Sequence, residues 1–416
     1  MNPFQDEPLR QLARQYGTPL WVYDAATIRQ RIGELKAFDT VRYAQKANSN
    51  THLLRLMREL GVKIDAVSRG EIQRALAAGY SASADASGAT GIVFTADLMD
   101  AATLETVVEH GIPVNAGSID MLEQLGARAP GHAVWLRINP GFGHGHSQKT
   151  NTGGEHSKHG IWHADLDAAL AAVARHHLKL VGLHMHIGSG VDYSHLAQVC
   201  QAMVALVRGV GAARLPDLHA VSAGGGLSIP YRAGDTRPDP QHYYQLWDAA
   251  RREIAALLAR PVQLELEPGR YLVAESGVLL SEVRAVKTMG SQRFTLVDAG
   301  FNDLMRPSMY GAYHGMHLIA ADGLPRPEAE TVVAGPLCES GDVFTQGEGG
   351  LVLRRALPEA RIGDLLVLHD AGAYGASMSS NYNTRGLAAE VLVDGGVARL
   401  IRRRQSVDEL LALEQV

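Results

Sequence analysis

Residues 41–80 read VRYAQKANSN THLLRLMREL GVKIDAVSRG EIQRALAAGY, and this stretch decides the fold. Short apolar runs begin at Val41 and Val62, and each is followed by a segment whose apolar residues recur at helical spacing. A strand, a helix and a second strand in succession are typical of a parallel sheet, because parallel strands need a long crossover. The stretch therefore predicts two successive βα units.

The same rhythm continues through the first two-thirds of the chain. Six more candidate strands, each closed by Gly, Pro, Asn, Asp or Ser, begin at Gly91, Pro113, Ala133, Leu180, His219 and Val262. Eight strands with helical crossovers predict a closed (β/α)8 TIM barrel. An open, doubly wound sheet is the alternative, because closure of a sheet leaves no mark in the sequence.

After about Ala274 the rhythm changes. Six segments read as strands without long helices between them, and they begin at Ser276, Arg293, Thr331, Asp364, Ala389 and Val397. Their turns carry Gly, Asp and Pro, which predicts an antiparallel β-domain. We expect residues 27–274 to form the barrel and residues 1–26 with 275–416 to form the β-domain; the final DELLALEQV is predicted as a helix.

Composition excludes several classes of function. The chain has 416 residues, of which 46% are hydrophobic and 20% charged, and its formal net charge is -5. Such values are ordinary for a globular protein and give no reason to expect a nucleic-acid or membrane partner. The N-terminal segment lacks the apolar core of a secretory signal, and two cysteines are too few for a disulfide framework. A reduced cytoplasmic enzyme is expected.

Polar residues gather at the predicted strand ends. Active sites of (β/α)8 barrels lie at the carboxyl ends of the strands, so groups found there are expected to share one pocket. Reading only those ends gives Lys46, Asp65, Ser68, Asn115, Arg137, His186, Gly224, Gly225, Gly226 and Glu267.

Each of these residues also has a structural interpretation. Lys46 is either a surface lysine or a desolvated amine able to form a Schiff base. The glycines of Gly224–Gly226 would bind a phosphate or simply make a tight turn. Glu267 would hold a proton on the nitrogen of a pyridine cofactor, or pair with Arg270 to close a turn.

Two segments of the second domain also carry chemical groups. CESGD, residues 338–342, places Cys338 beside two carboxylates, and DAGAYGASMSSNYN, residues 370–383, is too polar for a core. Cys338 is also readable as a small buried hydrophobe. Cys200 is expected to be one, because it lies in an apolar helical stretch.

These segments resemble one family. YAQKANSN, HMHIGSG, SAGGGLSIPY, LEPGRYLV, AGFNDLMRPSMYGAYH, GPLCESGDVF and DAGAYGASMSSNYN together resemble the diaminopimelate decarboxylases, most closely the enterobacterial type. That family shares its fold with alanine racemase and eukaryotic ornithine decarboxylase. The resemblance runs in order from about Pro19 almost to the end of the chain.

The resemblance implies roles for the matching residues. Lys46 would carry pyridoxal 5′-phosphate covalently, His186 would stack on its ring, and Glu267 would pair with its ring nitrogen. The other cofactor-binding residues that it implies are Asp65, Arg137, Ser189, Gly224, Gly225, Gly226, Pro268, Gly269, Arg270 and Tyr374. The substrate-binding residues that it implies are Arg270, Arg306, Tyr310, Glu339 and Tyr374.

The resemblance also implies a homodimer in which the active sites are shared between subunits. In this family CESGD enters the site of the neighbouring subunit. Cys338 would then be the proton donor and Glu339 a substrate contact, both supplied in trans.

The implied reaction is decarboxylation of meso-2,6-diaminopimelate to L-lysine and CO2, the last step of lysine biosynthesis. Glutamate at position 267 argues against a racemase, because alanine racemases have arginine there. One alternative is another decarboxylase of the same fold, acting on ornithine, arginine or a carboxylated polyamine. The other is a catalytically silent pyridoxal-phosphate-binding relative, which need not keep Cys338, Arg306 and Tyr374 along with Lys46.

One position departs from the usual pattern. Many family members read SKFG where residues 157–160 read SKHG, so His159 replaces an apolar aromatic residue in a loop near the barrel mouth. The histidine-rich stretch from His144 to His159 has no fixed ligand spacing, and no metal site is expected there.

Overall fold

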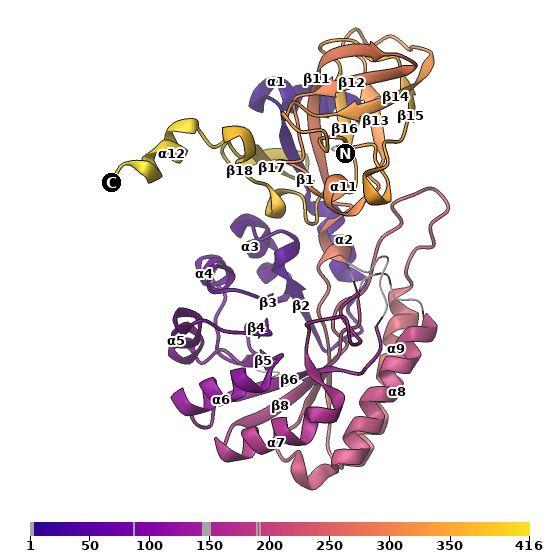
Figure 1. The fold of residues 1–416 in the computed structure, drawn as a ribbon. Helices are drawn as coiled ribbons and strands as arrows, with labels where there is room; N and C mark the ends of the chain where they lie inside the picture. Colours follow the sequence, from indigo (N-terminus) through magenta and orange to yellow (C-terminus); the bar gives the residue numbers. More distant parts are fainter. Residues whose placement is uncertain (1–3, 86–87, 144–150, 189, 191–192) are drawn as a thin grey trace. The chain divides into compact units, whose positions relative to one another are not determined.

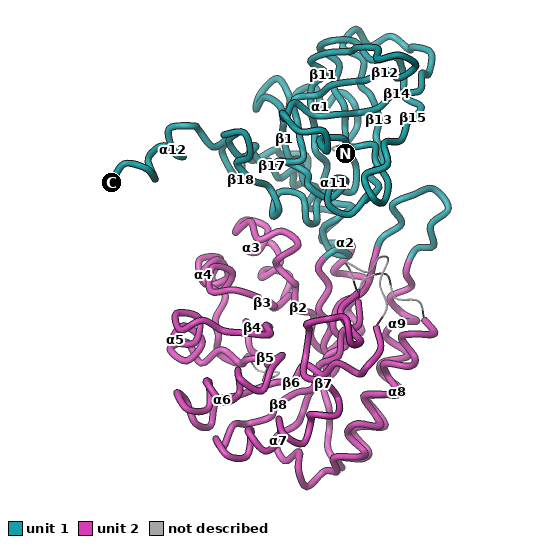
Figure 2. Tube along the Cα trace, in the orientation of Figure 1, with its two compact units in different colours: residues 1–30, 229–237, 270–416 teal, residues 31–228, 238–269 magenta. Residues whose placement is uncertain are grey.

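The chain forms two compact units. The computed structural model describes residues 4–416 apart from 86–87, 144–150, 189 and 191–192. Unit 1 comprises residues 1–30, 229–237 and 270–416, and unit 2 comprises residues 31–228 and 238–269 (Figure 2). Across the described part of the chain, no helix is both long enough and apolar enough to cross a membrane.

Unit 2 is a closed barrel of eight parallel strands. The strands are β2 (Thr40–Ala44), β3 (Lys63–Ala66), β4 (Ile92–Ala96), β5 (Val114–Ala116), β6 (Ala133–Asn139), β8 (Lys179–His184), β9 (Ala220–Ser222) and β10 (Gln263–Leu266). Neighbours pair in this order, and β10 pairs with β2 to close the ring. The short β7 (Ile161–Trp162) pairs with β6 outside the ring. The predicted barrel is confirmed: each predicted run overlaps one of its strands, and closure of the ring excludes the open sheet.

Helices follow the strands and lie outside the ring (Figure 1). They are α3 (Thr51–Glu59), α4 (Arg69–Ala77), α5 (Ala101–His110), α6 (Ile119–Arg128), α7 (Leu166–Arg175), α8 (Tyr193–Val210) and α9 (Pro240–Leu258). Short polar side chains begin several of them: Asn50, Ser68, Asp100, Ser118 and Asp239 each accept a hydrogen bond from a backbone N–H of the first turn. Ser68, one of the predicted site residues, is therefore a helix cap.

A buried ion pair joins the two strands that close the barrel. Arg42 of β2 and Glu265 of β10 are each 2% exposed, and the arginine Nε lies 2.5 Å from a glutamate oxygen. The guanidinium also donates to the second carboxylate oxygen at 2.9 Å and to the Thr90 carbonyl at 2.6 Å. Removing one partner would leave an uncompensated charge in the barrel interior.

We expect Glu265→Leu to lower the free energy of unfolding by about 3–5 kcal/mol, because Arg42 then stays buried without its counter-charge. Urea unfolding followed by circular dichroism measures the loss. The double variant Arg42→Leu/Glu265→Leu should recover most of it, since two apolar side chains replace the pair. If Glu265→Leu were as stable as the wild type, the stabilising role of the Arg42–Glu265 ion pair would be contradicted.

Unit 1 is organised by a nine-stranded mixed sheet. Its strands are β1 (Leu20–Asp24), β11 (Gly277–Met289), β12 (Gln292–Val297), β13 (Met316–Ile319), β14 (Glu328–Ala334), β15 (Arg355–Pro358), β16 (Leu365–Leu368), β17 (Ala389–Asp394) and β18 (Val397–Arg402). The order is β15-β14-β12-β11-β1-β17-β18, with β16 pairing with both β11 and β13.

The second predicted domain is confirmed as a β-domain, but its sheet is not purely antiparallel. The β1–β17 and β12–β14 pairs are parallel. Both pairs join strands far apart in the sequence, so the local turn signals that indicated antiparallel hairpins did not apply to them. The sequence interpretation also missed β1, β13 and β15, which are four or five residues long.

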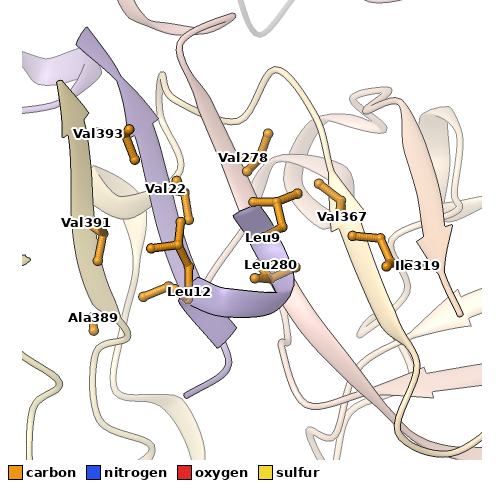
Figure 3. Packing of buried hydrophobic residues seen from close by; sticks show 11 residues of the cluster. Leu9, Leu12, Val22, Val278, Leu280, Ile319, Val367, Ala389, Val391 and Val393 are labelled. Carbon is orange, nitrogen blue, oxygen red and sulfur yellow. The ribbon is translucent and has the colours of Figure 1, made fainter. Parts of the chain in front are cut away.

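The N-terminal helix completes the core of unit 1. Helix α1 (Asp6–Tyr16) buries Leu9 and Leu12, which pack with side chains from the sheet (Figure 3). The sheet residues of this cluster are Leu20, Val22, Val278, Leu280, Ile319, Val367, Ala389, Val391 and Val393. The remaining helices are short: α2 (Ala25–Gly33), α10 (Arg270–Val273), α11 (Arg306–Tyr310) and α12 (Val407–Leu411). The predicted C-terminal helix is therefore only partly α-helical.

Candidate active site

Lys46 lies just beyond the carboxyl end of β2. It sits in a single 3₁₀ turn, Gln45–Ala47, whose other two residues are buried while the lysine side chain is exposed. The turn is held to α4, because the Gln45 amide donates to the Glu71 carbonyl at 2.9 Å. A buried turn thus presents an accessible amine at the strand end.

Glu267 follows β10 and is the centre of a buried hydrogen-bond network. One carboxylate oxygen accepts from the Ser222 hydroxyl at 2.8 Å, and the other lies 2.9 Å from His184 Nε2. Burial by itself raises the pKa of Glu267, but His184 and Ser222 outweigh it and lower the pKa to about 2. The barrel therefore keeps an ionised carboxylate, only 8% exposed, at neutral pH.

Asp65, at the end of β3, is held differently. It is 4% exposed, and burial, followed by the charge of Glu267, raises its pKa to about 6. Lys46 and a hydrogen bond from Thr95 act in the opposite direction. One carboxylate oxygen of Asp65 and the Nδ1 atom of His184 are buried without a hydrogen-bond partner among the described residues. Two polar atoms at the strand ends are thus left for a ligand.

The glycines after β9 form a fixed loop against His186. Gly224 has φ +62°, and a Cβ there would lie 2.7 Å from His186 Cβ; a Cβ on Gly225 would lie 2.8 Å from the Glu267 carbonyl. Only glycine allows both close approaches. Burial, and next the charge of Arg137, hold the pKa of His186 well below its ordinary value. The imidazole is therefore neutral beside the loop.

Tyr243 holds the glycine loop from helix α9. Its buried hydroxyl lies 2.9 Å from the Gly225 carbonyl and 3.2 Å from the Ala223 carbonyl, and its single proton is shared between these two acceptors, with Gly225 the nearer. Carbonyls drawn towards the hydroxyl point away from an anion that the loop N–H groups would bind.

Arg137 and His159 lie near the end of β6. Arg137 is 8% exposed, and within the described residues it has no ion-pair partner. His159 Nδ1 is 2.6 Å from Asp97, whose second oxygen accepts from the Gly160 backbone at 2.9 Å. The histidine at the unusual position thus ties its loop to the end of β4. Residues 144–150 of the histidine-rich stretch lie outside the described residues, as does Ser189.

The barrel residues fit a phosphorylated pyridine aldehyde. Lys46 offers an accessible amine, Glu267 an ionised carboxylate, and Gly224 and Gly225 a turn that a Cβ would obstruct. The neutral ring of His186 offers a flat face beside that turn. Such a donor set suits imine formation, a protonated ring nitrogen, a phosphate and an aromatic ring.

Unit 1 carries a separate cluster of cations and aromatic rings. Arg270 donates to the Tyr231 hydroxyl at 2.7 Å, and its guanidinium lies 5.1 Å from the Tyr374 ring centre. Arg306 is 6% exposed and lies 4.9 Å from the Tyr231 ring centre. Tyr310 also lies near Arg270. Neither arginine forms an ion pair with a carboxylate in the described chain, so both are suited to an anionic ligand.

Tyr374 has a conformation that is uncommon for its residue type. Its φ is +57°, in the left-handed region that tyrosine rarely occupies. A Cβ on the neighbouring Gly372 would lie 1.9 Å from the Val273 carbonyl, so the segment is tightly fitted. Strained backbone conformations of this kind cluster at active sites and ligand-binding segments.

Cys338 and Glu339 lie on the surface of unit 1. Both are exposed, and the Cys338 backbone N–H donates to Asn383 at 2.9 Å. Asp342 fixes the CESGD loop, because its carboxylate accepts from the backbones of Leu337 and Phe301 at 2.8 and 2.7 Å. Cys200 is buried, and burial raises the pKa of its thiol to about 12, as suits a core residue. The two cysteines are therefore in opposite environments.

Reading the strand ends of the sequence identified the charged groups at the end of the barrel but missed the residues that hydrogen-bond to the predicted site residues. The structure brings Lys46, Asp65, Arg137, His186 and the glycine loop with Glu267 to one end of the barrel, with Asn115 bonded to Thr95 beside them. Five supporting residues were missed: His184, Ser222, Tyr231, Tyr243 and His314. For His184 and Ser222 a signal existed, since each lies two residues before a predicted site residue in the same predicted strand run. The suggested Glu267–Arg270 ion pair is absent from the described structure, and both side chains have other partners.

Comparisons with known proteins identify the family of the chain. Residues 26–274 match the family model "Pyridoxal-dependent decarboxylase, pyridoxal binding domain". The chain is 66% identical over 411 residues to the diaminopimelate decarboxylase of Escherichia coli K12, covering 98% of this chain and 96% of that protein.

Solved structures agree as well. A crystal structure of diaminopimelate decarboxylase superposes with a TM-score of 0.95 at 65% identity, covering 99% of this chain and 97% of that one. The Helicobacter pylori diaminopimelate decarboxylase complexed with L-lysine has a TM-score of 0.85 at 31% identity, covering 98% and 99%. By fold and sequence, the chain belongs to the diaminopimelate decarboxylases, a family of pyridoxal-dependent decarboxylases.

Proposed function

We propose that this protein decarboxylates meso-2,6-diaminopimelate to L-lysine and CO2, with pyridoxal 5′-phosphate as cofactor. The observation that carries the proposal is the buried, ionised Glu267, held by His184 and Ser222 at the end of β10. A carboxylate there keeps a proton on a pyridine nitrogen, which favours the loss of CO2. Membership of the family supports the choice of substrate.

The barrel residues would hold the cofactor. When bound, it supplies an electron sink for the pair left on the α-carbon as CO2 departs. Lys46 would bind it covalently, Glu267 would hold the proton on its ring nitrogen, and His186 would lie against its ring. Asp65 and Arg137 would act near the lysine, and the remaining contacts would come from Ser189, Gly224, Gly225, Gly226, Pro268, Gly269, Arg270 and Tyr374.

The cluster in unit 1 would bind the substrate. Arg270 and Arg306 lack carboxylate partners within the described chain and would bind substrate carboxylates, with Tyr310 and Tyr374 beside them. Glu339 would take the distal ammonium group. Arg270 is three residues from Glu267, which supports action of both groups on one substrate.

A homodimer would complete each active site. The exposed positions of Cys338 and Glu339 on an anchored loop suit delivery to a neighbouring subunit. Cys338 would there donate the proton that replaces CO2 on the α-carbon. Because this thiol is exposed and unpaired, the reducing cytoplasm is the compartment that we infer.

Shared sites predict complementation between inactive subunits. Lys46→Ala and Cys338→Ala are each expected to lower turnover about 10²-fold or more, because each removes a group that acts on the reaction. When the two variants are mixed and allowed to exchange subunits, hybrid dimers should regain activity, up to one competent site in each. Cys200→Ala serves as the matched cysteine control and should stay active. No recovery on mixing would favour a site built within one chain.

Tyr243→Phe is expected to weaken pyridoxal-phosphate binding about 5- to 10-fold. The reason is that the glycine loop loses the hydroxyl to which the Gly225 carbonyl is hydrogen-bonded. Cofactor dissociation constants, measured by absorbance titration of the apoprotein, test this. Tyr244→Phe is the control on the same helix, since its ring packs edge-on to Phe38 and, among the described residues, no hydrogen bond joins its hydroxyl to the loop. Equal affinities for both variants would contradict the role of Tyr243.

The proposed substrate is tested by offering the purified protein, with added cofactor, four amino acids separately. We expect meso-diaminopimelate to react with a kcat/KM at least about 10³-fold above those of L-lysine, L-ornithine and L-arginine, because only it presents a distal carboxylate to the arginines. Preference for ornithine or arginine would identify a different decarboxylase of this fold. No reaction with any of them, despite bound cofactor, would favour a silent relative.

A further inference from the structure

Arg306 is a buried cation with an unusual partner. It begins helix α11 and is 6% exposed, and one of its terminal nitrogens lies 2.9 Å from Nε2 of His314. Burial raises the pKa of Asp370 to about 6 and the charge of Arg306 acts weakly against this, but no hydrogen bond or ion pair joins the two residues in the described structure. A buried arginine usually lies against a carboxylate; this one lies against an imidazole.

The hydrogen bonds of His314 define its protonation state. The side chain is fully buried, and its Nδ1 lies 2.8 Å from the His369 carbonyl. A carbonyl only accepts, so Nδ1 carries the proton and donates. A guanidinium only donates, so Nε2 presents its lone pair to Arg306. Only the neutral imidazole with the proton on Nδ1 satisfies both contacts. Burial, and next the charge of Arg306, also hold the pKa of His314 well below its ordinary value.

A neutral partner has a consequence for binding. A carboxylate in place of His314 would also fix the guanidinium, but it would cancel the charge of Arg306 and compete with an incoming anion. The imidazole accepts the hydrogen bond without adding a negative charge. Tyr231 does the same for Arg270, since its neutral hydroxyl accepts at 2.7 Å. The ring of Tyr231 also packs edge-on to that of His314, with centres 5.8 Å apart.

We propose that His314 is a positioning residue for substrate recognition: it orients Arg306 through a hydrogen bond and leaves the positive charge of Arg306 free for a substrate carboxylate. The inference rests on the proposed function, in which Arg306 binds that carboxylate. It adds a residue that contacts the arginine and not the substrate.

Glutamine and glutamate at position 314 form a matched pair, because they have the same size and differ in charge. His314→Gln keeps a neutral acceptor for Arg306, and its KM for meso-diaminopimelate should stay within about threefold of the wild type. His314→Glu keeps an acceptor but neutralises the arginine, and its KM should rise about 10²-fold. His314→Leu removes the acceptor, and its KM should rise about 10-fold. In all three variants, kcat and the absorbance of bound cofactor should change little. Arg306 is proposed to bind the substrate, so a change in its orientation should appear in KM.

The outcomes separate the two claims. If the wild type turns over meso-diaminopimelate and the Glu and Gln variants have equal KM values, the role of His314 is contradicted while the proposed function stands. A fall in kcat with unchanged KM in the Leu and Glu variants would also contradict it. If the wild type itself fails to act on meso-diaminopimelate, both claims are overturned. Cofactor absorbance and thermal unfolding identify any variant that does not fold. The KM values of the variants that do fold then test the role of His314.

Discussion

Replacement of Lys46 by alanine is expected to abolish the visible absorbance of lysine-bound cofactor and to lower turnover about 10³- to 10⁴-fold. The structure presents this amine on a buried turn at the end of β2, near the acidic group of Asp65. Without the amine, the protein would lose both the covalent attachment point that we propose for the cofactor and the group that we propose releases the product. Glu267, His186 and the glycine loop stay in place, so weak noncovalent binding should persist.

Lys63→Ala is the matched control for this experiment. Lys63 belongs to the same barrel but pairs with Asp85 in a partly exposed ion pair, so its loss should leave absorbance and turnover unchanged. Borohydride reduction of the wild type followed by peptide mapping should place the cofactor on the peptide that contains Lys46. Retention of the visible band by Lys46→Ala would refute the assignment of this lysine.

The second large effect is expected from Glu267→Gln, which should lower kcat about 10²- to 10³-fold while cofactor still binds. Glutamine fits the same space and still meets His184 and Ser222, but it has no negative charge to keep a proton on a ring nitrogen. The loss should therefore fall on the departure of CO2 and not on assembly of the site. Single-turnover decay of substrate, compared with the cofactor dissociation constant, measures the two separately.

Glu71→Gln is the control for the change of charge. Burial raises the pKa of Glu71 to about 7, and the residue lies near Asp65 and Lys46. Among the residues that the structure describes, its carboxylate accepts a single hydrogen bond, from the Val67 backbone N–H at 2.8 Å. Glutamine is able to accept the same bond, so activity should change less than about threefold. If both variants lost the same fraction of kcat, the loss would come from removing any negative charge at this end of the barrel, and not from a specific role of Glu267.

Much of the fold was predictable because it is local. The eight barrel strands were found from the alternation of apolar runs with helical segments, and several of the barrel helices begin at a short polar residue such as Asn50 or Ser68. The mixed sheet of unit 1 was not predictable in the same way. Strand β1 pairs with β17, more than 360 residues later, and no local pattern carries such a pairing.

The site shows the same division. Lys46, Asp65 and Glu267 were identified because a barrel keeps its polar groups at strand ends. His314 and Tyr243 act through other residues, and their importance depends on which atoms they meet in the folded chain. A tyrosine in an amphipathic helix and a histidine after a loop have nothing in their surroundings that separates them from ordinary core residues.

Formation of L-lysine from meso-diaminopimelate tests the central claim most directly. Purified protein with added pyridoxal phosphate should release CO2 and L-lysine in equal amounts, and the Lys46→Ala variant should release neither above background. CO2 release from ornithine or arginine with no lysine formed from meso-diaminopimelate would contradict the proposed substrate. Bound cofactor with no product from any of these amino acids would contradict the proposed enzyme activity itself.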